Sequence, residues 1–274
     1  MISVNTNTAV MAAIQNLNRS SADLQQTQSA ISTGKKIANV RDNGAVWVIA
    51  NKMSNDVESY NRVRESNDRA NAILDTGIAA GEGIMELLNE MKAKALAATQ
   101  TGLSAASQSA LAADFAQLRD QITTVIANAS FDGTNLVDSS PDNAIALGDS
   151  SGGNSITIAG ANLSLGGSIV SVTASSALDT TTNATAALSA VNASITALGT
   201  QLATWGAGAK RLEVHKNFVG KLQDALNTGI GSLVDADLSV ESARLQSLQV
   251  KRQLGIQALS IANSTTQTAL GLFR

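Results

Sequence analysis

A chain of 274 residues is long enough for one or two domains with a sizeable buried core, and its 44% apolar content fits a folded protein. The formal net charge of -3 argues against a nucleic-acid partner, because Lys and Arg are spread along the chain rather than concentrated. The absence of cysteine excludes disulfides and thiolate metal sites. No segment approaches the roughly 20 consecutive apolar residues that a membrane span needs, and the start lacks the pattern of a secretory signal. If the protein leaves the cell, we expect it to leave by another route.

The first predicted helix runs from about Thr6 to Ile31. Gly34 follows it as a stop signal, and Lys35 and Lys36 stand where the negative end of the helix dipole favours cations. Apolar residues recur every seven positions along this helix, which keeps one seam turned toward a partner helix. The seam residues are Val10, Leu17, Leu24 and Ile31.

An irregular connector is predicted from Gly34 to about Lys52, where turn-forming Asn, Asp and Gly residues gather. A broad apolar face then predicts a second helix over about 53–99, and a stripe with steps of three and four predicts a third around 111–125. The solvated side of the second helix carries acid–base pairs four residues apart, which support a helix without implying another function. These pairs are Glu58 with Arg62, Glu65 with Arg69, and Glu90 with Lys94.

Glycines punctuate the segment at about 129–175, and its short runs alternate apolar and polar residues, which indicates a small set of β-hairpins. Alternation of period two points one set of side chains to the same face of a strand. The same-face pairs are Ile156 and Ile158, Leu163 and Leu165, and Val170 and Val172.

The longest heptad run lies in a helix predicted from about Asn183, where apolar residues from Leu188 to Leu212 alternate steps of three and four. A step of three then leads to His215, which predicts a local shift of the seam before it resumes toward Leu233. The segment Asp235 to Asp237 is able to cap a new helix. The terminal repeat follows, with Leu238, Leu245, Leu259 and Phe273 in one register and Arg252 and Thr266 in the gaps.

No catalytic constellation emerges. The single histidine, His215, lies on an apolar seam, where packing is the favoured role, and the chain contains neither HExxH nor GxxxxGK[ST]. Asp42, Asp235 and Asp237 are cation ligands by chemistry, but capping and turn formation explain them better. Trp47 and Trp205 are either interface anchors or local core residues, and the sequence does not separate these roles. We therefore predict no enzyme, no cofactor and no metal.

Pairing seams at both ends of the chain predict a protein that joins other copies of itself. The residues at these ends resemble bacterial flagellin, the subunit of the flagellar filament. The N-terminal motifs are Asn5-Thr6-Asn7, Leu17-Asn18, Ile31-Ser32-Thr33-Gly34-Lys35-Lys36-Ile37 and Arg41-Asp42-Asn43-Gly44-Ala45. The C-terminal motifs are Asp235-Ala236-Asp237-Leu238, Glu241-Ser242-Ala243-Arg244-Leu245, Gln253-Leu254-Gly255, Ala258-Leu259-Ser260-Ile261-Ala262-Asn263 and Leu272-Phe273-Arg274.

The resemblance implies a mainly α fold with long coiled-coil helices from both termini and a small central β-hairpin region. Residues 1–34 and 238–274 would form a terminal coiled-coil domain in the filament core, and residues 35–237 a helical domain with hairpins at about 129–175. The middle looks like a flagellin without large outer domains. Many flagellins carry a proline near the C-terminus, whereas Thr265-Thr266 here leaves the last helix uninterrupted.

The function implied is that of a structural subunit that polymerises into the bacterial flagellar filament for swimming motility. The seam residues of both ends would then pack subunits together. The implied partners are copies of the same chain, paralogous flagellins, the flagellar export apparatus, a secretion chaperone, and the filament cap and junction proteins, with no nucleic acid and no membrane. The implied location is extracellular, in the filament. A hook-filament junction protein is the alternative, and a secreted hydrolase on a helical scaffold is a third reading that no site in the sequence supports.

Overall fold

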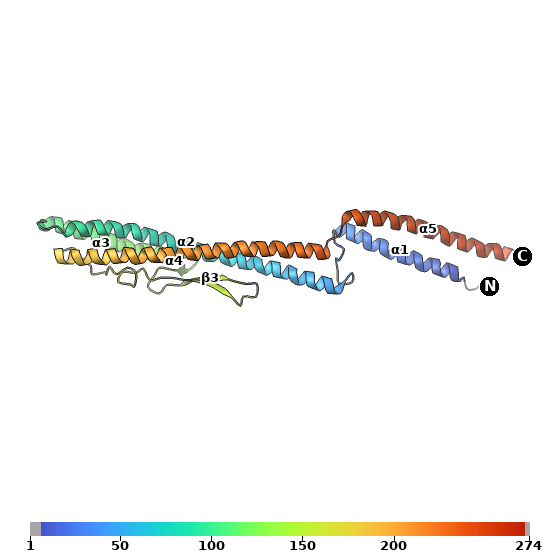
Figure 1. Ribbon diagram of the computed structural model, residues 1–274, viewed down its shortest axis with the longest axis horizontal. Coiled ribbons are helices and arrows are strands. Elements are labelled where there is room, and N and C mark those ends of the chain that lie inside the picture. Colours follow the sequence, from blue (N-terminus) through green and yellow to red (C-terminus); the bar gives the residue numbers. More distant parts are fainter. Residues whose placement is uncertain (1–6, 272–274) are drawn as a thin grey trace. The chain divides into compact units, whose positions relative to one another are not determined.

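The computed structural model describes residues 7–271 of the chain (Figure 1). Within them the fold is mainly α, as the sequence predicts. The helices are α1 (Thr8–Thr33), α2 (Gly44–Ala98), α3 (Ala105–Asn128), α4 (Thr181–Val234) and α5 (Leu238–Gly271). The strands are β1 (Ser130–Phe131), β2 (Thr134–Asn135), β3 (Asn143–Leu147) and β4 (Ser155–Ala159). Helix α5 runs through Thr265-Thr266 without interruption, which confirms the expectation from the missing proline.

Helix α1 begins and ends at residues whose local chemistry favours those positions. The side chain of Asn7 caps its start, because Asn7 Oδ1 accepts a 3.1 Å hydrogen bond from the backbone N–H of Val10. Gly34 ends it with φ at 70°, a left-handed conformation that glycine adopts without the strain of a side chain. The predicted stop signal is confirmed, and the predicted start differs by two residues.

Helix α2 begins at Gly44, nine residues before the predicted start at about Met53. Asn43 supplies the cap, since its Oδ1 accepts from the backbone N–H of Val46 at 3.2 Å. The residues Asn43 and Gly44 favour a turn by composition, so the prediction of an irregular connector here is wrong, and the helix already starts at Gly44. The residues 45–50 are apolar on every side, so they lack the period that marks a helix at the surface.

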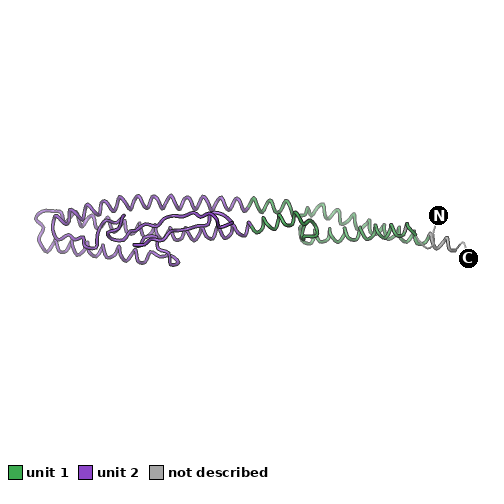
Figure 2. Tube along the Cα trace, turned by 90° about the horizontal axis from the view of Figure 1, so that it is seen from below, with its two compact units in different colours: residues 1–55, 224–274 green, residues 56–223 purple. Residues whose placement is uncertain are grey.

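The chain divides into two compact units, coloured separately in Figure 2. Unit 1 consists of residues 1–55 and 224–274, and unit 2 of residues 56–223. Helices α2 and α4 contribute to both units. Unit 1 therefore includes the start of α2 and the end of α4 beside the terminal helices, a wider set than the terminal domain of 1–34 and 238–274 that the resemblance implies. That narrower domain stays a prediction about the assembled state.

Unit 2 packs most of α2, α3, most of α4 and the hairpins around one core. Its largest fully buried side chains include Trp205, Phe115, Leu88, Ile122 and Leu198. Along α4 every seventh position from 184 to 219 is buried, namely Ala184, Val191, Leu198, Trp205, Leu212 and Val219. The heptad run predicted from the sequence is thus the buried face of α4.

The predicted shift of this seam at His215 is wrong. The regular spacing continues through Lys216 and Gln223, which a pattern of apolar residues does not include because both are polar. Lys216 Nζ lies 2.5 Å from Asp68 Oδ1 in α2. Gln223 is buried, and its amide nitrogen donates to the carbonyl of Val57 at 3.1 Å and to Asn61 Oδ1 at 2.8 Å. Satisfied polar groups therefore occupy two positions of an otherwise apolar seam.

The central segment contains two antiparallel hairpins, β1 with β2 and β3 with β4. In the longer one Ala144 pairs with Ile158 and Ala146 with Ile156, and all four side chains are buried on one face. The strands predicted around 163–165 and 170–172 are absent from the described residues. Leu163, Val170 and Val172 are buried, but this segment lies on the core as an irregular chain.

The ion pairs on α2 differ from two of the three predicted from the sequence. Arg62 reaches Glu58 at 3.2 Å as predicted, and it also reaches Glu65 at 2.9 Å. Arg69 instead reaches Asp132 in the β1–β2 turn at 2.7 Å, and Lys94 reaches Asp114 of α3 at 2.6 Å. Two of the predicted pairs within α2 are therefore replaced by ion pairs with other elements. The spacing of residues along one helix cannot reveal such partners.

Candidate assembly surface

Helices α1 and α5 pack along one another in unit 1, and both views show them side by side (Figures 1 and 2). Leu24 of α1 and Leu248 of α5 are buried, each with 7% of the residue exposed. Further along, a Cβ added to Gly255 would lie 3.4 Å from Leu17 Cδ1, so the glycine allows a close approach of the two helices. This packing joins the two ends of the chain, as the paired heptads suggested.

The sequence-predicted packing residues take different positions along this seam. Leu24 is buried, and five others are half-buried: Val10, Leu17, Ile31, Leu245 and Leu259. Leu238 is 50% exposed, because α5 begins there, beyond the end of α1. Phe273 lies outside the described residues. The buried and half-buried residues thus belong to a seam between two helices of one chain. Their role in packing between subunits stays a prediction.

The seam has a second row of residues that the seven-residue repeats do not include. Scanning at intervals of seven selected one row from each helix, whereas a coiled coil uses two rows, separated by steps of three and four. The second row of α1 contains Ser20 and Thr27, and that of α5 contains Leu248. Ser20 and Thr27 are buried although polar, so apolar character alone was a poor signal for them. Their spacing from Leu17 and Leu24 was the signal that was available.

Helix α5 has a second apolar face, here called the outer face and defined by Val240, Val250 and Leu254. These residues are 60%, 55% and 58% exposed. At 3.6 residues per turn they lie about 100–180° around the helix from the centre of the two rows that pack on α1. A helix that packs on one side only is expected to be polar on the other. The outer face of α5 is therefore an apolar surface that the described part of this chain leaves exposed.

The connectors next to the terminal helices bind one another. The backbone N–H of Lys36 donates to the carbonyl of Val234 at 2.8 Å, and that of Ala236 donates to the carbonyl of Gly34 at 2.9 Å. The ammonium of Lys36 also donates to the carbonyl of Ser232 at 3.0 Å. These contacts hold the end of α1 beside the start of α5.

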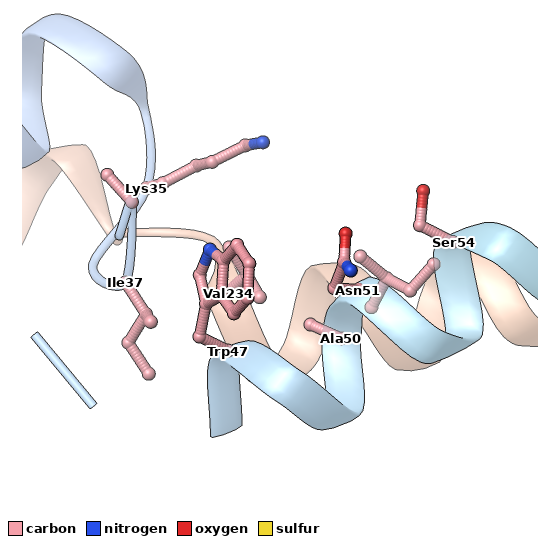
Figure 3. Close-up of a pocket in the computed structure, with 9 residues that line it drawn as sticks. Lys35, Ile37, Trp47, Ala50, Asn51, Ser54 and Val234 are labelled. Atoms are coloured by element: carbon pink, nitrogen blue, oxygen red, sulfur yellow. The ribbon is translucent and has the colours of Figure 1, made fainter. Parts of the chain in front are cut away.

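A small recess lies beneath the first connector (Figure 3). Ile37 of the connector, Trp47 and Ala50 of α2, and Val234 of α4 contribute apolar atoms to its lining. The side chains of Lys35 and Ile37 point in different directions from the connector, and both residues line the recess. No set of acidic or nucleophilic groups converges there, and the recess serves the packing of the connector on α2.

The residues considered for chemistry have structural partners. His215 is half-buried, with Nε2 3.1 Å from the carbonyl oxygen of Gly148. Asp42 accepts from the backbone N–H groups of Ala38 and Asn39 at 2.9 and 3.1 Å. Asp237 caps α5, accepting from the backbone N–H groups at 239 and 240 at 2.9 and 3.2 Å. The predicted structural roles are confirmed: His215 is half-buried, Asp42 stabilises a turn and Asp237 caps a helix.

Asp235 and the two tryptophans also have defined places. Asp235 is exposed and forms an antiparallel bridge with Lys35 between the connectors. Trp205 belongs to the core of unit 2, whereas Trp47 is half-buried beside the recess in unit 1. Within residues 7–271 no cluster of His, Asp and Glu side chains is placed to hold a metal ion. None of the described helices is both long and apolar enough to cross a bilayer.

The described residues combine paired terminal helices with a second, exposed apolar face, and this combination is typical of a structural subunit that assembles through helices. The family model for the bacterial flagellin N-terminal helical region matches residues 4–142, and that for the flagellin C-terminal helical region matches residues 188–273. The chain therefore belongs to the bacterial flagellin family, whose members are structural proteins of the flagellar filament.

Curated relatives match along almost the whole chain. Flagellin FljO of Caulobacter vibrioides is 45% identical over 272 residues, which cover 99% of this chain and 98% of the relative. Flagellin FljJ of the same organism is 42% identical over 274 residues, which cover 100% of this chain and 99% of the relative. A flagellin of Brucella melitensis is 32% identical over the full length of both. These relatives identify the chain as a filament subunit, and none of them favours the hook-filament junction alternative.

The crystal structure of Bacillus cereus flagellin supports the fold. It shares 22% identity with this chain at a TM-score of 0.50, and the match covers 56% of this chain and 88% of that one. At this level of identity the likeness concerns the fold alone.

Proposed function

We propose that this chain polymerises through the outer face of α5, which the α1–α5 pairing leaves exposed. Val240, Val250 and Leu254 carry the proposal, because each is more than half exposed although apolar. Fully burying a side chain of this size contributes about 1.5–3 kcal/mol, an upper value for residues that are already partly covered. A subunit that covers this face with its neighbours gains stability that the isolated chain lacks. The sequence-predicted residues Leu238 and Phe273 belong to the same proposed packing.

The polymer is proposed to contain paralogous flagellins as well as copies of this chain. The related Caulobacter flagellins FljO, FljM, FljK, FljN and FljJ, from one organism and 42–45% identical to this chain, support this. We also propose, from the resemblance, that the chain is exported through the flagellar secretion apparatus with a secretion chaperone. Contacts with the filament cap and junction proteins belong to the same proposal. We propose an extracellular filament for swimming motility as the site of action and no enzymatic activity.

The experiment is polymerisation of the purified protein, followed by sedimentation and electron microscopy. Leu254→Asp places a charge on the outer face and should abolish filaments. Ser260→Asp is the matched control, since it adds the same charge on the same helix at an exposed polar position. Circular dichroism of both monomers shows that helix content is retained. Filaments of normal length from Leu254→Asp would refute the proposal.

A further inference from the structure

Helix α4 exposes two large apolar side chains on the side away from the core of unit 2. Val214 and Phe218 lie one turn apart and are 58% and 59% exposed. Arg211 and Lys221 flank them, and all four fall within an arc of about 80°. The buried residues Leu212 and Val219 lie on the other side of the helix. Arg211, Val214, Phe218 and Lys221 are called the basic face.

The cations of the basic face are available for a partner. The other cations of this stretch are already paired within the unit: Lys210 binds Glu213 at 2.8 Å and Lys216 binds Asp68 at 2.5 Å. Within residues 7–271, Arg211 and Lys221 have no such ion pair. The two cations favour a partner surface with negative charge. The two large apolar side chains between them favour a partner surface with small side chains.

Helix α2 of the same unit carries a surface of that kind. Asp75, Glu82, Glu86 and Glu90 are exposed along one side of the helix, and they are called the acidic face together with Ala79 and Gly83. In the described part of the chain none of the four carboxylates forms an ion pair. A Cβ added to Gly83 would meet nothing within 4 Å, so the surface there is open. The buried residues Ile84, Leu88 and Met91 lie on the opposite side of α2.

The two faces of one copy cannot meet. The helices α2 and α4 contact one another elsewhere around their circumference, where a Cβ on Gly81 would lie 2.8 Å from Leu202 Cδ2. On each helix the exposed face lies about 140–160° around from that contact. The faces also differ in level. Lys216 is level with the middle of the basic face, although it points to the other side of α4, and it lies beside Asp68. At 1.5 Å per residue, the midpoint of the acidic face near Glu82 is about 20 Å further along α2.

We propose that the basic face of one copy docks on the acidic face of a second copy, a contact that rests on the proposed function and specifies part of its geometry. With the copies parallel, α4 of one copy runs antiparallel to α2 of the next. Arg211 then reaches Glu86 and Glu90, Lys221 reaches Asp75, and Phe218 packs over Ala79 and Gly83. Each copy uses one face for each neighbour, so the contact is heterologous and extends as an open array with a stagger of about 20 Å.

Charge reversal tests the contact in the full chain. Arg211→Glu with Lys221→Glu should raise the critical concentration for polymerisation about tenfold or more, because like charges then face one another across the interface. Asp75→Lys with Glu86→Lys should have a similar effect. All four substitutions together restore opposite charges and should return the critical concentration toward that of the unaltered protein. If Arg211→Glu with Lys221→Glu polymerises at the same critical concentration as the unaltered protein, the proposal is overturned.

Failure of rescue by the four-substitution variant, with helix content retained in all variants, would also overturn the proposal. The Leu254→Asp variant in the same assay separates the two hypotheses, because its loss of filaments supports polymerisation through α5 whatever the charge reversals do.

A crosslink gives a direct readout. The chain has no cysteine, so Phe218→Cys and Gly83→Cys introduce single thiols into two separate preparations. Copolymerisation of the two under mild oxidation should give a disulfide-linked dimer that unpolymerised mixtures lack. Asn217→Cys replaces Phe218→Cys as the control, since it lies about 100° around α4 from the phenylalanine. Equal yields of dimer from Phe218→Cys and Asn217→Cys would contradict the docking geometry.

Discussion

The indole Nε1–H of Trp205 donates a hydrogen bond of 2.9 Å to the carbonyl oxygen of Ala159, which joins the middle of α4 to the end of β4. Trp205 is fully buried. Trp205→Phe leaves the Ala159 oxygen without this donor and leaves a cavity, so the free energy of unfolding should fall by about 2–4 kcal/mol. Urea denaturation followed by circular dichroism measures it. Trp47→Phe, at the half-buried recess of unit 1, should cost less; equal losses would count against this account.

The glycines at 206 and 208 predict opposite effects of the same substitution. A Cβ on Gly206 meets nothing within 4 Å, so Gly206→Ala should gain about 1 kcal/mol of unfolding free energy from helix propensity. A Cβ on Gly208 would lie 2.9 Å from Ile158 Cδ1 and 3.2 Å from its Cγ atoms. Gly208→Ala should therefore destabilise unit 2 by up to about 2 kcal/mol net, because the strand side chain must move. Thermal melts of the two variants, two residues apart on α4, test the contrast.

The seam between α1 and α5 contains a polar side chain without a partner. The buried Oγ of Ser20 finds no hydrogen-bonding group among the described residues. Ser20→Ala removes this group and should stabilise the pairing of the terminal helices by about 1 kcal/mol. Slower amide exchange in α1 and α5 of the monomer is the expected observation. Unchanged exchange would mean that the hydroxyl carries no such cost in solution.

The turn between β3 and β4 should weaken in acid. Hydrogen bonds to the Asp149 carboxylate, from Ser151 above all and also from Asn154 and the backbone N–H of Gly153, hold the pKa of Asp149 below its ordinary value of 3.8. Because the pKa of Asp149 is lower in the folded state, the ionised carboxylate stabilises the turn fully at a pH above the pKa of the unfolded state. This stabilisation is lost as the pH falls through the pKa of the folded state. Amide exchange at Ser151 and Gly153, corrected for intrinsic rates, should lose protection below pH 3.8. Asp149→Asn should remove this pH dependence, and its persistence would assign the effect to another group.

The sequence predicted those parts of the fold in which local chemistry and packing agree. Gly34 ends α1 because the chain turns left-handed there, and the heptads of α4 are buried because they face the core. The prediction failed where a distant partner decided the outcome. The segments that contain Leu163 and Val170 alternate apolar and polar residues like strands. In the structure both side chains are buried in the core, but their backbone pairs with no strand.

The candidate site was predicted only in part for a similar reason. A seven-residue repeat detects one row of a seam, and this row includes Leu24, which is buried on the helix that packs along α5. The repeat does not include Val250 or Leu254. Apolar character alone does not distinguish a residue of the outer face from a residue of the seam. Only the placement of α1 along α5 shows which apolar residues remain exposed.

The contact between Lys36 and Ser232 spans 196 residues of sequence, and this separation sets an order for folding. Unit 2 is one continuous stretch of chain, so it is complete before the last residues of the protein are available. Unit 1 takes residues from both ends and has to wait for the second end. Prior folding of unit 2 shortens the loop that must close and lowers the entropy cost of bringing the ends together. The surface proposed for polymerisation is thus finished last, after the body that carries it.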